Sequence, residues 1–182
     1  MMPMYPYRPF LFAFLFCLFA FSKVQAQEFA VYDSLPQLAS RIQQAGNSTL
    51  VVNFWATWCK PCVEELPCFE ELRKKYAEQN VQILLVSLDF KSQLEKKFIP
   101  FLKAQQLKSE VVLFADQNTN TWIPQISEDW DGAIPVTVVF KGKQRAISHG
   151  KFDDFAALEN FVRPFIGDSS VISLKSLIHC GK

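Results

Sequence analysis

The stretch of sequence from Leu50 to Leu66 reads LVVNFWATWCKPCVEEL. Its first residues are apolar and β-branched, which favours a buried strand, and its last residues favour a helix. Cys59 and Cys62 lie at the junction, separated by two residues. A helix N-terminus exposes unpaired N–H groups and a partial positive charge, and both stabilise a thiolate. The spacing lets Cys62 attack a mixed disulfide formed by Cys59, so the stretch indicates dithiol–disulfide chemistry.

The overall charge of the chain is close to balanced. Its 182 residues include 19 basic and 18 acidic side chains, which gives a formal net charge of +1. Such a chain has no large electrostatic field of one sign, which is what binding to nucleic acid usually requires. We therefore expect no nucleic-acid partner.

The first 26 residues have the three-part layout of a secretory signal peptide. Arg8 provides positive charge, an apolar run of 12 residues follows from 10 to 21, and short side chains precede Ala26. A membrane anchor is the alternative, but a helix of this length rises only about 18 Å, against about 30 Å for the hydrocarbon core of a bilayer. We expect cleavage after Ala26 and export to the periplasm, where disulfides persist.

From residue 27 onward, strand patterns alternate with helix patterns. Buried strands are expected at 49–55, 81–88 and 111–114, and helices at 38–44, 60–79 and 119–126. A further helix begins at Ser92, with Pro100 as a kink or break. The turn Lys141-Gly142-Lys143 predicts a hairpin, and Asp153 is expected to cap a last helix. This alternation predicts an α/β fold, in which helices flank a central mixed β-sheet on both faces.

The motif residues resemble those of a known family. Trp55 to Cys62, followed by Glu65-Leu66-Pro67, is similar to the thioredoxin superfamily, and more narrowly to the exported TlpA/ResA-like thiol–disulfide oxidoreductases. The segment from Ala133 to Thr137 resembles the cis-proline loop of that family, and an X–Pro bond adopts the cis form at little cost. The resemblance implies a thioredoxin-like domain over 27–168, with a central strand–helix insertion, and a C-terminal tail over 169–182.

The resemblance also implies a role for each motif residue. Cys59 would be the attacking thiolate, and Cys62 would resolve the mixed disulfide. Client proteins would bind at Trp58, Ile134 and Pro135. Two further residues support the site: Lys60 adds positive charge, and Pro61 fixes the first helical turn, where a missing N–H costs nothing. The redox-active group would be the Cys59–Cys62 disulfide itself, with no cofactor and no metal.

Asn53 departs from the thioredoxin pattern, which has a buried Asp at this place. An amide is not a proton acceptor at neutral pH. Glu65 lies one helical turn after Cys62, where ResA-like proteins carry an active-site glutamate. A partly buried carboxyl group there would have a raised pKa and relay protons to the resolving thiol. We expect Glu65 to be catalytic in this sense; the alternative is a solvated helix glutamate.

The resemblance implies an exported oxidoreductase that reduces disulfides in extracytoplasmic client proteins. A membrane-embedded electron donor would recharge it, and cytochrome c biogenesis is one setting for such a protein. The direction of electron flow stays open, because the potential depends on the stability of each redox form. Two alternatives also stay open. One is a redox-silent module that binds clients at Pro135. The other is a peroxiredoxin-like peroxidase, although of the Pro/Thr/Cys loop of such enzymes the chain has only Thr57, two residues before Cys59.

The remaining cysteine patterns limit other readings of the motif. Haem attachment is excluded because Val63, and not a histidine, follows Cys62. A zinc site is disfavoured because the chain has no second Cys-x-x-Cys and no paired histidines. Cys68 is either a buried free thiol or the partner of Cys180 in a disulfide that ties down the tail.

Overall fold

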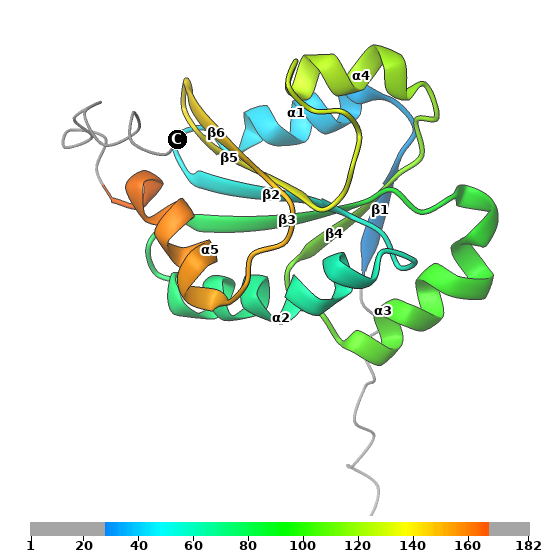
Figure 1. Cartoon of the computed structure of the whole chain (residues 1–182), viewed down its shortest axis with the longest axis horizontal. Coiled ribbons are helices and arrows are strands. Elements are labelled where there is room, and N and C mark those ends of the chain that lie inside the picture. The colour runs from blue at the N-terminus through cyan, green and yellow to red at the C-terminus, as the bar shows by residue number, and fades with distance from the viewer. Residues whose placement is uncertain (1–27, 168–182) are drawn as a thin grey trace, which may run out of the picture.

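Six strands form one mixed sheet in the order β1-β4-β3-β2-β5-β6 (Figure 1). The computed structural model of the protein describes residues 28–167; the expected signal peptide and Cys180 lie outside this range. Strands β1, β4, β3 and β2 run parallel to one another, whereas β5 is antiparallel to β2 and to β6. Their bounds are Phe29–Tyr32 (β1), Thr49–Trp55 (β2), Val81–Ser87 (β3), Glu110–Phe114 (β4), Val136–Lys141 (β5) and Gln144–His149 (β6).

Helices cover both faces of this sheet (Figure 1). One face packs against α1 (Leu35–Gln44) and α4 (Thr119–Ile126), and the other against α2 (Lys60–Lys75), α3 (Ile99–Gln105) and α5 (Phe155–Val162). The fold is thioredoxin-like, as the resemblance implied, and β4 and α4 lie in the central part of the chain where the resemblance implies a strand–helix insertion.

Strand β2 divides the hydrophobic core into two halves. Val51 and Trp55 point into the half under α2, α3 and α5, whereas Leu50, Val52 and Phe54 point into the half under α1 and α4. All seven residues of β2 are buried. This explains why the strand reads as a continuous apolar run instead of an alternating one.

An aromatic cluster fills the half of the core under α1 and α4. Phe54 packs against Trp130 with ring centroids 4.8 Å apart, and Trp130 packs against Trp122 at 5.5 Å. Both tryptophans are buried, and each indole N–H donates to a backbone carbonyl, that of Trp122 to Asp116 and that of Trp130 to Ala133. Trp130 thereby ties the insertion to the loop before β5.

The segment after β3 differs from the single kinked helix that the sequence predicted. A 3₁₀ turn, η1 (Lys91–Gln93), leads into a π-helical turn, η2 (Leu94–Phe98), and only then into α3. The N–H of Ile99 donates to the carbonyl of Leu94, five residues back. Pro100, which has no N–H to donate, then lies in the first turn of α3, directly after this change of helix type.

Three further expectations need correction. Strand β1 was not predicted, because its four residues lie at the edge of the sheet and are too few to show a pattern. Helix α2 ends at Lys75 and not at Gln79. The side chain that caps α5 is Asp154 and not Asp153: its Oδ1 accepts the N–H of Ala157 at 2.8 Å. Within the described residues, no helix is both long and apolar enough to cross a membrane.

The cap of α5 gives a stability test with a neighbouring control. Asp154→Ala removes the acceptor for the Ala157 N–H, so the free energy of unfolding should fall by about 1 kcal/mol. Asp153→Ala leaves the cap intact and should change it by less than about 0.5 kcal/mol. Urea unfolding of both oxidised variants measures the difference. Equal losses would show that Asp154 does not cap the helix.

Candidate active site

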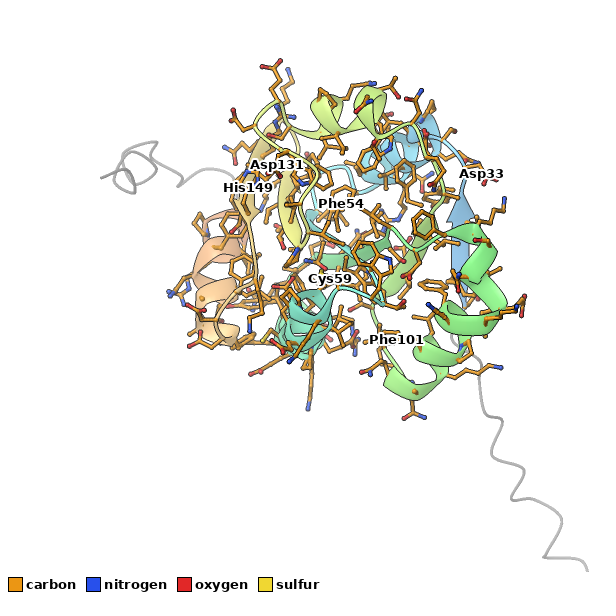
Figure 2. The ribbon with its side chains drawn as sticks, turned by 45° about the vertical axis from the view of Figure 1, so that its right-hand side comes forward. Asp33, Phe54, Cys59, Phe101, Asp131 and His149 are labelled. Carbon is orange, nitrogen blue, oxygen red and sulfur yellow. A yellow bond between two sulfur atoms is a disulfide. The ribbon has the colours of Figure 1, made fainter. Side chains whose placement is uncertain are left out.

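Cys59 and Cys62 are joined by a disulfide where β2 gives way to α2. Cys59 is the N-cap residue of α2, and its Sγ accepts the N–H of Cys62 at 3.4 Å. Figure 2 marks the position of Cys59 in the molecule. Of the two cysteines Cys59 is the more exposed, at 6% against 0% for Cys62. Cys59 is therefore the more accessible of the two cysteines.

The two supporting residues lie in the first turn of α2. Pro61 occupies a position where a helix needs no N–H donor. The side chain of Lys60 extends into solvent, where its Nζ lies 3.9 Å from a carboxylate oxygen of Glu64. Glu64 also pairs with Lys151 at 3.0 Å, so this end of the helix carries a small network of surface charges.

The loop before β5 lies against the disulfide. The Ile134–Pro135 bond is cis, as the resemblance implied, and the carbonyl oxygen of Ile134 lies 3.7 Å from Cys59 Sγ. Gly150, just after β6, donates its N–H to the Pro135 carbonyl at 2.9 Å. The structure thus brings together Cys59 and a loop 75 residues further along the chain.

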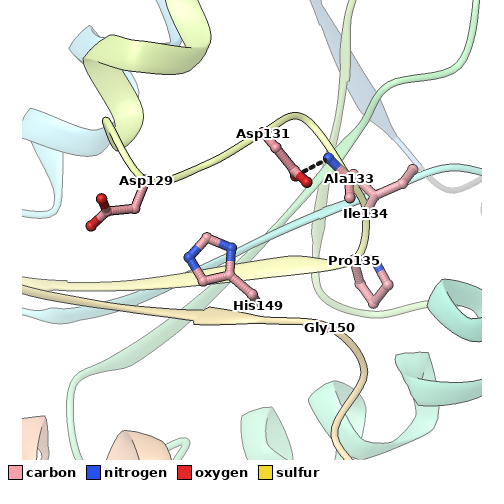
Figure 3. Close-up of a pocket in the computed structure, with 7 residues that line it drawn as sticks. All are labelled: Asp129, Asp131, Ala133, Ile134, Pro135, His149 and Gly150. Carbon is pink, nitrogen blue, oxygen red and sulfur yellow. Dashed lines mark hydrogen bonds between the residues drawn. The ribbon is translucent and has the colours of Figure 1, made fainter. Parts of the chain in front are cut away.

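A cavity of about 330 Å³ opens beside Pro135 (Figure 3). Asp131 holds the loop that lines this cavity, because the Oδ1 atom of Asp131 accepts the Ala133 N–H at 2.9 Å. The cavity is lined by Asp129, Asp131, Ala133, Ile134, Pro135, His149 and Gly150.

Apolar surface flanks the disulfide. Among the described residues, Trp58 and Phe90 are the large hydrophobic side chains that are exposed, at 59% and 52%. The sequence singled out Trp58 but not Phe90. The two lie on neighbouring loops, since the residues before them, Thr57 and Asp89, are hydrogen-bonded to each other.

Asp89 is a site residue that the sequence analysis missed. It is buried, and its carboxylate accepts hydrogen bonds from the Thr57 N–H (2.9 Å), the Thr57 hydroxyl (2.6 Å) and the Ser87 hydroxyl (2.7 Å). These bonds fix the loop that presents Cys59. The sequence carries only a weak signal for it, a lone acidic residue after the expected strand at 81–88, and this signal does not identify Thr57 as its partner.

Glu65 is buried and not solvated. Its two carboxylate oxygens accept hydrogen bonds from the Asn53 amide (2.9 Å) and from the Phe152 N–H (3.0 Å). Burial raises the pKa of Glu65 from 4.5 to about 7, although these two bonds and the positive charge of Lys151 act in the opposite direction. The carboxyl group can therefore gain and lose a proton near neutral pH.

Cys68 lies on the same helix, outside this constellation. It is partly buried, and within residues 28–167 it has no disulfide partner. Burial, together with the charge of Glu71, raises the pKa of its thiol. Cys180, its hypothetical partner, lies outside the described residues. Also within that range, no three His, Cys, Asp or Glu side chains are arranged to hold a metal ion.

Comparisons with known proteins agree with this geometry. The profile of the AhpC/TSA family matches residues 23–146. The chain is 35% identical over 92 residues to the thioredoxin-like protein YneN of Bacillus subtilis, covering 50% of this chain and 45% of YneN. It is 33% identical over 69 residues to the thiol-disulfide oxidoreductase ResA of Oceanobacillus iheyensis, covering 38% of this chain and 36% of ResA.

A solved structure shares the fold over a larger part of the chain. It belongs to a Chlorobium tepidum protein assigned as the thiol:disulfide interchange protein DsbE, with a TM-score of 0.54 and 25% identity. The match covers 69% of this chain and 85% of that one. By contrast, the chain spans less than half the length of the two curated relatives described above.

The raised pKa of Glu65 predicts a specific pH dependence of stability. Below pH 4.5 the carboxyl group is protonated in both the folded and the unfolded state, and above about pH 7 it is ionised in both. Between these values it ionises only in the unfolded state, so the free energy of unfolding falls as pH rises. Relative to Glu65→Gln, the wild type should lose about 3 kcal/mol across this window, because each unit of difference between the folded and unfolded pKa corresponds to about 1.4 kcal/mol.

Urea unfolding of the two oxidised proteins at pH 4 to 8 measures this difference. Other carboxyl groups contribute equally to both proteins and cancel. Parallel pH profiles would mean that Glu65 titrates at an ordinary carboxyl pKa.

Asp89 gives a second stability test. Asp89→Ala leaves the Thr57 N–H and two hydroxyl groups without their acceptor and should lower the free energy of unfolding by about 3 kcal/mol. Ser87→Ala removes only one of these bonds and should cost about 1 kcal/mol. Equal small losses in urea unfolding would argue that the loop before Cys59 is held by other contacts.

Proposed function

The chain belongs to the AhpC/TSA family of thioredoxin-like proteins, and from this premise we propose that it is a thiol–disulfide oxidoreductase that reduces disulfides in client proteins. The observation that carries the proposal is the Cys59–Cys62 disulfide at the start of α2, next to the Ile134 carbonyl. A helix N-terminus favours a thiolate on Cys59, and the neighbouring loop offers backbone groups to a client strand.

The reaction begins with the reduced pair. The Cys59 thiolate attacks one sulfur of the client disulfide, whose S–S bond breaks, and the other client sulfur leaves as a thiolate. Cys62 then attacks Cys59 Sγ, which forms the Cys59–Cys62 bond and releases the second client sulfur. Two electrons pass from the pair to the client, and the two client thiolates take up two protons to become thiols.

Glu65 serves as the proton acceptor for Cys62. Cys62 is fully buried, so its thiol needs a nearby base before it can attack. A carboxyl group with a pKa of about 7 takes this proton at neutral pH and returns it to the leaving client thiolate. An ordinary surface glutamate, with its pKa near 4.5, would hold the proton too weakly to act in this way.

Client segments bind in extended form along the Ile134–Pro135 loop. Their main chain pairs with the loop backbone, and their apolar side chains rest on exposed Trp58 and Phe90. The dithiol carries both electrons itself, so the reaction uses no further cofactor.

The protein works outside the cytosol, after export directed by residues 1–26. Reducing equivalents are scarce in such a compartment, so the oxidised pair has to be recharged across the membrane by an embedded electron donor. Apocytochrome c, whose cysteines must be reduced before haem attachment, is one client that fits this setting.

The two alternatives have less support. A redox-silent module would not require a disulfide-bonded cysteine pair at the start of a helix, where a thiolate is stabilised. A peroxidase would need the Thr57 hydroxyl at the reactive sulfur, but this hydroxyl donates to Asp89 at 2.6 Å.

Insulin reduction driven by dithiothreitol tests the proposal. The wild type should accelerate the reaction, and Cys59→Ser should fall to the rate of dithiothreitol alone. Cys62→Ser should form a stable mixed disulfide with a client peptide, seen as added mass in non-reducing mass spectrometry, because Cys59 attacks but nothing resolves the product. Cys68→Ser is the matched control and should keep wild-type activity. Equal activity of the wild type and Cys59→Ser would refute the proposed function.

A further inference from the structure

The side chain of Asn53 is fully buried beside Glu65, and only one end of its amide is used. Its Nδ2 donates to Glu65 Oε1 at 2.9 Å and to Thr137 Oγ1 at 3.1 Å. Among residues 28–167, no group donates a hydrogen bond to Asn53 Oδ1, which is itself buried. A buried carbonyl oxygen without a partner is uncommon and calls for an explanation.

The two hydrogen bonds that Glu65 accepts favour its ionised form. Both carboxylate oxygens accept hydrogen bonds, one from Asn53 and the other from the Phe152 N–H. When Glu65 gains a proton, its new O–H needs an acceptor, whereas Asn53 and Phe152 both present donors to the carboxyl group. The Phe152 N–H is fixed by the backbone, whereas the Asn53 amide can turn about its own bond.

A half-turn of the Asn53 amide gives this O–H an acceptor, and it transfers the unpartnered position from Oδ1 to Nδ2. Oδ1 and Nδ2 have nearly the same size, so they can exchange places without disturbing the packing. After the turn, Oδ1 accepts hydrogen bonds from the protonated carboxyl of Glu65 and from the Thr137 hydroxyl, which donates instead of accepting. The oxygen that has no partner in one state is the acceptor that the other state needs.

We propose that Asn53 and Thr137 are positioning residues of the proton relay, and that the Asn53 amide turns over each time Glu65 gains or loses a proton. The proposal rests on the proposed function, in which Glu65 exchanges a proton with Cys62. In that step the S–H bond of Cys62 breaks, its electron pair stays on sulfur as a thiolate, and the proton forms an O–H bond on Glu65. The proton then passes to the leaving client thiolate, and the amide turns back.

A neutral amide is suited to this position. A carboxylate in place of Asn53 would put two acidic groups side by side, and one of them would then hold a proton at neutral pH. The charged and titratable neighbours of Glu65 lie on other elements than β2 and β5. Lys151, in the segment after β6, lowers the pKa of Glu65. The charge of Glu65 in turn raises the pKa of Cys68 on α2. Cys62, one turn earlier on α2, is the group with which Glu65 exchanges the proton. The strands β2 and β5 face it with neutral groups.

Side-chain NMR of the oxidised wild-type protein tests the proposal directly. The Asn53 amide signals should change with pH at the same midpoint as the Glu65 carboxyl carbon, near pH 7. The cross-peaks from the Asn53 Nδ2 protons to Thr137 should be present above this midpoint and lost below it. In Glu65→Gln, the Asn53 signals should not titrate. Cross-peaks that stay unchanged while Glu65 titrates would overturn the proposal.

Two variants extend the test to the redox couple. Asn53→Leu removes the donor that stabilises ionised Glu65, so Glu65 should titrate about one pH unit higher. The bend in a plot of Cys59/Cys62 potential against pH should move with it. Thr137→Val removes only the hydroxyl group. It should reduce the pH-dependent change of the Asn53 amide signals and shift the pH of the bend by less than Asn53→Leu does. It replaces Asn53→Leu in the test if that variant does not fold. An unmoved bend in a folded Asn53→Leu protein would contradict the role of Asn53.

The outcomes separate this inference from the proposed function. A wild-type protein that reduces insulin but keeps its Asn53 amide fixed refutes only the amide turn. A protein that fails to reduce insulin refutes the oxidoreductase, whatever the amide does.

Discussion

Strand β2 is the element on which the rest of the structure depends, because it is buried on both faces and paired along both edges. It pairs with β3 over all seven of its residues and with β5 from Leu50 to Phe54. A shift of one residue would exchange the two halves of the core and move Asn53 away from Glu65. The register of β2 is therefore fixed, and with it the point at which the chain turns to present Cys59.

Burial of Glu65 connects stability with chemistry. A solvated carboxyl group would cost no stability but would be ionised at neutral pH. Placing the group beneath α2, against Asn53, raises its pKa to about 7 and makes the folded state less stable above that pH. The fold tolerates this cost because the apolar residues on either side of Asn53, Val51 and Trp55, are fully buried in the same half of the core.

Sequence reasoning succeeded where a pattern has a strong physical cause. The apolar run of β2 and the bounds of α4 (119–126) were predicted as the structure has them. It failed where the cause is tertiary. Strand β1 exists through pairing with β4, and the π-helical turn of η2, which directly precedes α3 and Pro100, leaves no pattern in the sequence. Asp153 and Asp154 could not be told apart, because a cap is defined by which of two adjacent residues reaches the Ala157 N–H.

The same limit applies to the site. The residues of the Cys-x-x-Cys motif and the loop at Pro135 could be singled out, because their sequences resemble those of a known family. Asp89 could not, since its role depends on Thr57, which lies 32 residues earlier and comes near only through the pairing of β2 with β3.

The pairing of β2 with β3 also decides where the site lies. β2 and β3 are parallel and end at the same edge of the sheet, and β5 begins there because it is antiparallel to β2. A parallel β5 would begin about 20 Å away, at the opposite edge. The antiparallel ladder thus brings Ile134 to Cys59 and, two residues after Pro135, sets Thr137 directly opposite Asn53. A single ladder therefore positions both the Ile134–Pro135 loop and the neutral neighbours of Glu65.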